Sequence, residues 1–559
     1  MNYLQKISRN RAVSIVHLAQ LIFVFSAYRL DPDPHHDGVI YGAAVGASQG
    51  LIPHKDFFSQ YGPMQPLING LWLKLFGASM LHLRLFYCVL LVACSWLVYS
   101  MLKNYLSTEL SLLIPTAWIF TGPFGLPWPS ILSTFLALIS IKLFEKAILN
   151  PRNRLLLFTL IFSSGMSVGF SVFVRIHILI LGLLMITLLI IFERTKIFSK
   201  EFVIPWILGF FGSIGIVLLY LYESGALKYY IYQSIVWPAN FYAKPNLTKS
   251  YVVNWLWYPA TFIIVLVAFY LIKIYYERSQ SNFKLIKTTT ILISVFILSY
   301  FFSIQEKTGS LTLRNPKVLT ITFADRLIHS VGYVTASLVI FITFHLIVKR
   351  NGTIQKSMDP FKWVYLVYGL GVFGQLYPLY DNYHLWMISP IFLLTTSIFI
   401  SKAVTENGNL AIKCLLISII LALCVQQVEL LRIPRYSYKS EELRGMESSW
   451  ISAKGTDLTL LELEDINKKI KFNCGNGLYA AANGEYQSQD RDFYVREQKS
   501  EMESKSTEYV FFCHSTRTAY SEYLKQGWEK TFEIPISIYF EGSTKVYWNV
   551  LLKNSEFTQ

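Results

Sequence analysis

The sequence has 559 residues, of which 53% are hydrophobic and 15% are charged, and its mean hydropathy is +0.40. A water-soluble protein needs a more polar surface, so these values exclude an ordinary soluble enzyme and predict an integral membrane protein. The net charge of +15 is divided among short Lys and Arg clusters between apolar runs, which favours anionic lipid over nucleic acid as a partner.

Apolar runs of about 20 residues recur along the chain, and helices of that length cross the hydrocarbon core of a bilayer while satisfying their own backbone hydrogen bonds. The first run, residues 12–25, has no small-residue cleavage site, so we interpret it as a membrane helix and not as a signal peptide. We expect about thirteen such helices in an all-α polytopic fold. After the first, they are centred near Leu91, Ala117, Leu136, Phe162, Leu184, Phe211, Ile263, Val295, Leu338, Tyr368, Leu393 and Ile419.

Basic residues set the expected orientation. Lys6, Arg9 and Arg11 precede the first helix and place the N-terminus in the cytoplasm by the positive-inside rule, and every later inward loop is then basic as well. A bacterial inner membrane fits this pattern best, with the endoplasmic reticulum as the alternative. The same count leaves four longer segments outside, which are residues 29–83, 223–250, 305–330 and everything after about 428.

The chain divides into two predicted domains. Residues 1–428 form the membrane domain, including the first outer loop at 29–83, and residues 429–559 lack any further spanning run. A helix-like pattern followed by strand-like alternation predicts a small α+β extracytoplasmic domain there. Cys474 and Cys513 lie in this domain and are disulfide candidates in an oxidising compartment, with two unpaired thiols as the alternative.

The first outer loop is unusually polar and begins directly after a membrane helix. A carboxylate at a membrane surface beside apolar walls is partly desolvated, which raises its pKa and improves it as a proton acceptor. Asp37 is therefore a candidate general base. The alternative is that Asp31, Asp33 and Asp37 cap a short helix that begins near Val39, where their charge suits the helix dipole.

Two local motifs carry a resemblance to a known family. The first outer loop has an acidic residue after the first helix and then a Gly-x-x-Pro-x-x-Asp-Phe stretch, and this arrangement resembles the GT-C glycosyltransferases, the group of protein O-mannosyltransferases and lipid A aminoarabinose transferases. A second stretch, Tyr377-Pro-Leu-Tyr-Asp-Asn-Tyr-His384, resembles a Pro, Asp and His cluster on the outer face of related enzymes. The first-loop elements are Asp37, Gly50, Pro53, Asp56, Phe57, Gly62-Pro63, Phe76-Gly77 and Arg84-Leu85.

This resemblance implies an inverting transfer of a sugar from a polyprenyl-phosphate carrier, with Asp37 deprotonating the acceptor hydroxyl. Arg and Lys side chains can stabilise a lipid monophosphate leaving group, so we expect no required cofactor. A divalent metal held by outer histidines and carboxylates is the less favoured alternative. Arg175 is the first choice for this role because an unpaired guanidinium at the end of an apolar helix is costly. The other candidates are Lys244, Arg314, Lys317 and Arg326, and snorkelling toward lipid headgroups is the alternative for each.

Several polar residues are further candidates for contacts with the donor sugar or phosphate. They are His36, Asp56, Asp381 and His384, and the last two are also placed to cap a membrane helix. Trp237, in an aromatic segment, is a candidate contact for the acceptor or for lipid, although interfacial anchoring is the commoner role of such rings.

Two other functions stay open. A polysaccharide ligase or polymerase also uses polyprenyl carriers, but of the diphosphate kind, and it predicts key Arg and His residues in a later loop and tolerance of Asp37→Asn. A transporter or flippase is expected to show internal repeats and charges at mid-membrane, which this sequence lacks. The sugar and the acceptor, whether a glycan, a lipid or a protein, are not specified by the sequence.

Overall fold

The computed structural model describes most of the N-terminal half of the chain and several parts of the remainder. The described residues are 3–32, 36–120, 127–149, 153–194, 198–242, 360–376, 382–407, 435–441, 443–448, 453–464, 466, 470–473, 509–515, 521, 523–540 and 543–554.

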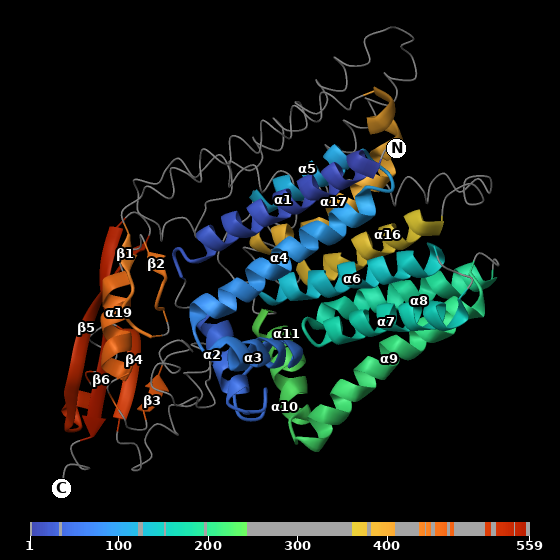
Figure 1. The fold of residues 1–559 in the computed structure, drawn as a ribbon. Helices are drawn as coiled ribbons and strands as arrows, with labels where there is room; N and C mark the ends of the chain where they lie inside the picture. The colour runs from blue at the N-terminus through green and yellow to red at the C-terminus, as the bar shows by residue number, and fades with distance from the viewer. Residues whose placement is uncertain are drawn as a thin grey trace.

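The described chain is mainly a body of long apolar helices (Figure 1). Five of its segments are long and apolar enough to cross a membrane, so the chain is an integral membrane protein. The membrane-length segments are 11–28, 80–102, 154–172, 176–194 and 200–223. The helices are α1 (Tyr3–Tyr28), α2 (His36–Ser48), α3 (Met64–Phe76), α4 (Met80–Leu102), α5 (Thr108–Phe120), α6 (Pro129–Leu149), α7 (Arg154–Val172), α8 (Leu179–Arg194), α9 (Lys200–Glu223), α16 (Pro360–Gly371) and α17 (Asn382–Asn407).

These helices confirm the hydropathy pattern where it can be compared. The predicted centres at Leu91, Phe162 and Phe211 fall inside α4, α7 and α9, and the short helix expected near Val39 is α2. The runs near 263, 295, 338 and 419 lie outside the described residues. The total of thirteen spanning helices therefore stays a prediction.

Small residues bring α7 and α9 into direct backbone contact. A Cβ atom added at Gly165 would lie 2.1 Å from the Trp206 carbonyl oxygen, and one added at Gly209 would lie 2.1 Å from that of Phe162. Helices in a bilayer gain little from hydrophobic burial against each other, so close packing of this kind is a main source of their association. The close contact with α9 fixes the position of α7, and α7 leads into the turn at residues 173–178.

Short helical segments connect the long helices on the side that carries α2 and α3. A 3₁₀ turn, η1 (Ile176–Ile178), joins α7 to α8, and another, η5 (Val372–Leu376), follows α16. After α9 the chain forms α10 (Leu227–Ile231), the π-helix η2 (Tyr232–Val236) and α11 (Trp237–Tyr242). Single π turns are rare and recur at functional sites.

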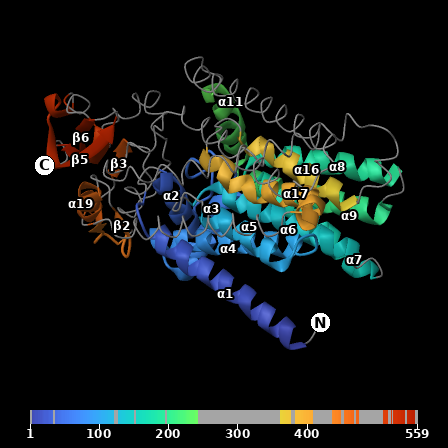
Figure 2. The same cartoon turned by 90° about the horizontal axis from the view of Figure 1, so that it is seen from above.

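The C-terminal part contains strands and one helix beside the end of the body where α2 lies, as Figure 1 and Figure 2 show. Four strands pair in the order β3-β4-β6-β5, with β3 parallel to β4 and the others antiparallel, and β1 pairs with β2 separately. That this α+β unit spans the whole of 429–559 stays a prediction. The elements are β1 (Tyr436–Ser437), β2 (Glu447–Ser448), α19 (Ala453–Glu464), β3 (Ile470–Asn473), β4 (Tyr509–Ser515), β5 (Trp528–Phe540) and β6 (Ser543–Asn554).

Candidate active site

Asp37 lies in the first turn of α2 and forms a fully buried ion pair with Arg84 of α4. The Arg84 guanidinium also donates hydrogen bonds to the carbonyl oxygens of Tyr28 (2.7 Å) and Leu30 (2.9 Å), at the end of α1. A buried charge is tolerated only when its partners satisfy it, and here one arginine joins α1, α2 and α4. The geometry also suits the alternative role of Asp37, since its charge lies at the N-terminus of α2.

A polar contact network leads from α4 to α3. Tyr87 lies one turn after Arg84, and its hydroxyl accepts hydrogen bonds from the Gln65 amide (3.0 Å) and the Asn69 amide (3.4 Å). The Gln65 amide also donates to the Pro127 carbonyl oxygen at 3.2 Å, next to Trp128. All three side chains are buried, so this network fixes α3 against the start of α6.

A cavity of about 50 Å³ opens close to this network, and we call it the Arg175 cavity. Four separate segments form it: residues 60–62 of the first loop, the α7–η1 turn, the α10–α11 region and the start of α17. Its lining residues do not include Asp37. They are Gln60, Tyr61, Gly62, Arg175, Ile176, His177, Tyr230, Ser234, Pro238 and His384.

Gly62 is the reason the first loop can lie against α7. A Cβ atom at this position would lie 1.9 Å from the Phe173 carbonyl oxygen, so no larger residue fits without moving the backbone. The Phe173 carbonyl oxygen accepts the Met64 amide at 3.1 Å. This contact places Tyr61 opposite Arg175.

Arg175 occupies an extended position between α7 and η1 and is 5% exposed. Its guanidinium donates to the Ser130 hydroxyl at the start of α6, and its Cζ lies 5.6 Å from the centre of the Tyr61 ring. The serine hydroxyl and the aromatic face help to orient the guanidinium beside the cavity. The cavity wall therefore includes a held guanidinium, a group that binds phosphate oxygens through directed, charge-assisted hydrogen bonds.

His384 faces the same cavity from the first turn of α17. Its Nε2 accepts a hydrogen bond from the Trp128 indole N–H at 3.0 Å, and Trp128 in turn contacts the edge of Tyr61 with ring centres 5.6 Å apart. Because Nε2 is the acceptor, the neutral ring carries its proton on Nδ1. His384 therefore joins Trp128 to the cavity wall, and an imidazole is a residue type that binds phosphate or hydroxyl oxygens.

The π-helix η2 fastens the first loop to the far wall of the cavity. The Gln233 amide oxygen accepts the Ser59 backbone N–H at 3.1 Å and contacts His54 Nδ1 at 3.1 Å, while its amide nitrogen donates to the His54 carbonyl oxygen at 3.0 Å. Burial lowers the pKa of His54 to about 4, against the opposing effect of this hydrogen bond, so the ring is neutral at physiological pH. Burial also raises the pKa of Tyr230, which keeps that wall uncharged.

Of the other predicted residues, Asp56 and Trp237 lie near the cavity but outside its lining. Asp56 accepts the Ile52 backbone N–H at 2.7 Å, which closes a turn of the first loop. Trp237 is buried and meets Phe58 edge-on with ring centres 5.7 Å apart, so in this structure it packs against protein.

The remaining predicted residues fall outside what the structure describes. His36 begins α2, but its side chain lies outside the described atoms, as does that of Cys513 on β4. Arg326, Asp381 and Cys474 lie outside the described residues, as do Lys244, Arg314 and Lys317. Within the part of the chain that the structure describes, no group of three His, Cys, Asp or Glu side chains is placed to hold a metal ion.

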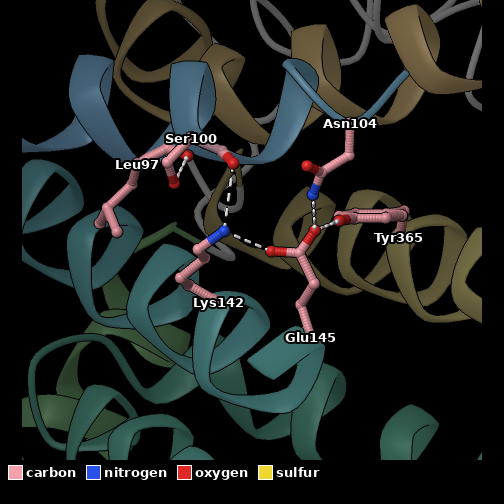
Figure 3. Close-up of polar contacts among 6 residues, drawn as sticks. All are labelled: Leu97, Ser100, Asn104, Lys142, Glu145 and Tyr365. Carbon is pink, nitrogen blue, oxygen red and sulfur yellow. Dashed lines mark hydrogen bonds and ion pairs between the residues drawn. The ribbon is translucent and has the colours of Figure 1, made fainter. Parts of the chain in front are cut away.

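A second charged cluster, which the sequence reasoning missed, lies toward the other end of α6 (Figure 3). Glu145 is 3% exposed, and its carboxylate accepts hydrogen bonds from Lys142 (2.5 Å), Asn104 (2.8 Å) and Tyr365 (3.4 Å). Lys142 also donates to the Ser100 carbonyl oxygen at 3.1 Å. This Lys142–Glu145 cluster ties α4, α6 and α16 together.

No family model and no curated protein matches the chain. Solved structures show a distant likeness. The oligosaccharyltransferase of Archaeoglobus fulgidus in a complex with zinc and sulfate gives a TM-score of 0.48 at 11% identity, over 89% of this chain and 67% of that chain.

Two further structures are similar at the same level. Oligosaccharyltransferase AglB from the same archaeon, in complex with an inhibitory peptide and a dolichol-phosphate, gives 0.43 at 10% identity over 91% of this chain and 70% of that one. ArnT from Cupriavidus metallidurans in the apo state gives 0.43 at 9% identity over 98% of each chain. Likeness this distant transfers no residue role, substrate or reaction to this chain.

Proposed function

We propose that this chain is an inverting glycosyltransferase that moves a sugar from a polyprenyl-phosphate carrier to an envelope glycan, lipid or protein on the outer face of a membrane, most simply the bacterial inner membrane. The observation that carries the proposal is the Arg175 cavity, which the buried Arg175 and His384 both line beside the loop with the GT-C-like motif. Both groups suit a phosphate oxygen.

In this proposal the leaving phosphate lies against Arg175. Charge grows on its oxygens as the bond to the anomeric carbon breaks, and a preorganised cation in a water-poor site stabilises that charge more than it does in water. The Ser130 hydroxyl and the Tyr61 ring hold the guanidinium in place before the ligand arrives. In this proposal the stabilisation of the leaving phosphate does not require a metal ion.

Asp37 is the proposed base. Its carboxylate pairs with Arg84, and the side chain is 0% exposed. A base must come within about 3 Å of the proton it removes. The proposal therefore requires that the acceptor hydroxyl gains access to this carboxylate.

One observation favours a second candidate. Arg175 and His384 line the cavity and Asp37 does not, which is the arrangement expected of a polyprenyl-diphosphate ligase or polymerase that needs no carboxylate base. Turnover by Asp37→Asn separates the two functions, because this change removes the negative charge and keeps the side-chain shape.

The test compares wild type with Asp37→Asn in membranes supplied with monophosphate or diphosphate lipid-linked sugars, following the loss of labelled sugar from the carrier. The glycosyltransferase proposal predicts monophosphate turnover by wild type and a loss of at least about 100-fold in the variant at normal abundance. Diphosphate turnover that survives Asp37→Asn would instead support the ligase.

A further inference from the structure

The start of the first loop is held between Arg84 and the C-terminal part of the chain. On one side, the Arg84 guanidinium donates hydrogen bonds to the carbonyl oxygens of Tyr28 and Leu30 and lies 3.5 Å from the carbonyl oxygen of Asp31. On the other side, β2 forms a parallel bridge with Leu30, in which Glu447 N–H donates to the Arg29 carbonyl oxygen at 3.1 Å and its own carbonyl oxygen accepts the Asp31 N–H at 2.7 Å.

The Leu30 N–H still donates to the Ala27 carbonyl oxygen at 3.1 Å, so these contacts hold the end of α1 and the residues directly after it from two sides. The carbonyl oxygens of residues 28 and 30 face Arg84, and that of residue 29 faces Glu447. Asp31 then adopts a φ of +47°, a left-handed conformation that turns the chain toward α2. Residues 29–31 are thus held from both sides between α1 and α2, the helix that carries Asp37.

The β1–β2 hairpin is itself fastened to α19. The Asp457 carboxylate of α19 accepts the backbone N–H groups of Lys439 (3.0 Å) and Ser440 (2.9 Å) and the hydroxyl of Tyr436 (2.7 Å). The turn into β2 also touches α4, because a Cβ atom at Gly445 would lie 3.0 Å from Leu81, one turn before Arg84. A displacement of the C-terminal part would therefore reach both residues 29–31 and the beginning of α4.

From these contacts we infer that the C-terminal part of the chain positions Asp37, acting through the pairing of β2 with residues 29–31 and through Arg84. The inference rests on the proposed function. Glu447 is its main positioning residue, and its backbone matters more than its side chain. The Arg29–Glu447 ion pair is 3.5 Å long with side chains 42% and 30% exposed, and such exposed pairs contribute little.

Glu447→Pro tests this inference, because proline lacks the backbone N–H that donates to the Arg29 carbonyl oxygen. Glu447→Gln is the matched control, because it removes only the side-chain charge. In the full-length protein we expect Glu447→Pro to lower kcat at least about tenfold with the donor KM within about twofold, and Glu447→Gln to keep both within about twofold. Hydrogen exchange at the Asp31 amide should rise in Glu447→Pro alone. Gly445→Ala, which strains a turn at φ +82°, is a milder variant expected to change kcat in the same direction.

The possible outcomes distinguish a failure of this inference from a failure of the proposed glycosyltransferase function. Wild-type kcat in Glu447→Pro, together with faster exchange at Asp31, overturns the inference and leaves the glycosyltransferase proposal standing. An absence of turnover in wild type overturns both. If Glu447→Pro does not fold, Gly445→Ala decides: a lowered kcat at constant KM supports the inference, and an unchanged kcat with raised Asp31 exchange contradicts it.

Discussion

The Arg175 cavity and the Lys142–Glu145 cluster lie about 22 Å apart along α6, judged from the helical rise between Ser130 and Glu145. Each places a cation among buried polar partners. In the cluster the Lys142 ammonium meets the Glu145 carboxylate, which also accepts hydrogen bonds from Asn104 and Tyr365, whereas Arg175 contacts a hydroxyl and an aromatic face and lines a cavity. Burial of a charge is therefore a poor guide to function by itself, and the cavity beside Arg175 is what marks it as a candidate binding residue.

Replacing Arg175 is expected to have the largest effect. Arg175→Ala should lower donor turnover by about 10²–10³-fold, because it removes the preorganised charge from the leaving phosphate. Arg154→Ala is the matched control, since this arginine lies at the other end of α7 with its side chain 89% exposed. Steady-state rates in purified membranes measure both, and equal losses in the two variants would remove the distinction between the cavity and the rest of the helix.

Breaking the Lys142–Glu145 cluster should damage the fold and spare the chemistry. Glu145→Ala leaves the Lys142 ammonium largely buried without its partner, at a cost of about 3 kcal/mol, whereas the double change Lys142→Met with Glu145→Leu should be nearly neutral. Thermal unfolding in detergent measures the difference. A Glu145→Ala protein of normal stability that has lost donor binding would mean that the cluster is a site after all.

His384 should contribute less than Arg175. His384→Ala removes the Nδ1–H donor from the cavity and is expected to lower kcat by about tenfold, the usual effect of one hydrogen bond to a charged ligand. His384→Gln keeps an acceptor for the Trp128 indole and an N–H donor, and should recover part of the activity. A wild-type rate in His384→Ala would contradict a role for His384 in turnover.

The smallest effect concerns pH. His54 is neutral in the fold with a pKa lowered from 6.5 to about 4, so the unfolded chain binds an extra proton between these values. Stability should therefore fall as pH drops from 6.5 to 4, by at most about 1.4 kcal/mol per pH unit, and change no further from this group below 4. His54→Gln should show a shallower slope in thermal unfolding across that window, and an unchanged slope would contradict the assignment.

The contrast between the two polar regions also shows what a sequence discloses. Hydropathy located α4, α7 and α9 because a spanning helix must be apolar over its whole length, and the cost of a lone guanidinium pointed to Arg175. Asp56 came from a motif, and its contact is with the first loop's own backbone. The catalytic role of Asp37 stays a prediction.

What could not be predicted depends on pairs of residues that are distant in sequence. Gln233 and His54 meet only because a π turn rotates η2 toward the first loop, and Glu447 reaches residue 30 across more than 400 positions of the chain. Lys142 and Glu145 escaped notice because averaging over an apolar run conceals a self-neutralising pair. No local pattern encodes such contacts, and tertiary packing decides them.

The central claim is that the Arg175 cavity holds the phosphate of a polyprenyl carrier. The most direct test is equilibrium binding of polyprenyl monophosphate, without sugar, to purified wild type, Arg175→Ala and Arg154→Ala. The account predicts that affinity falls by at least about tenfold in Arg175→Ala and is unchanged in Arg154→Ala. Equal affinity in all three proteins would contradict it and place the phosphate elsewhere in the chain.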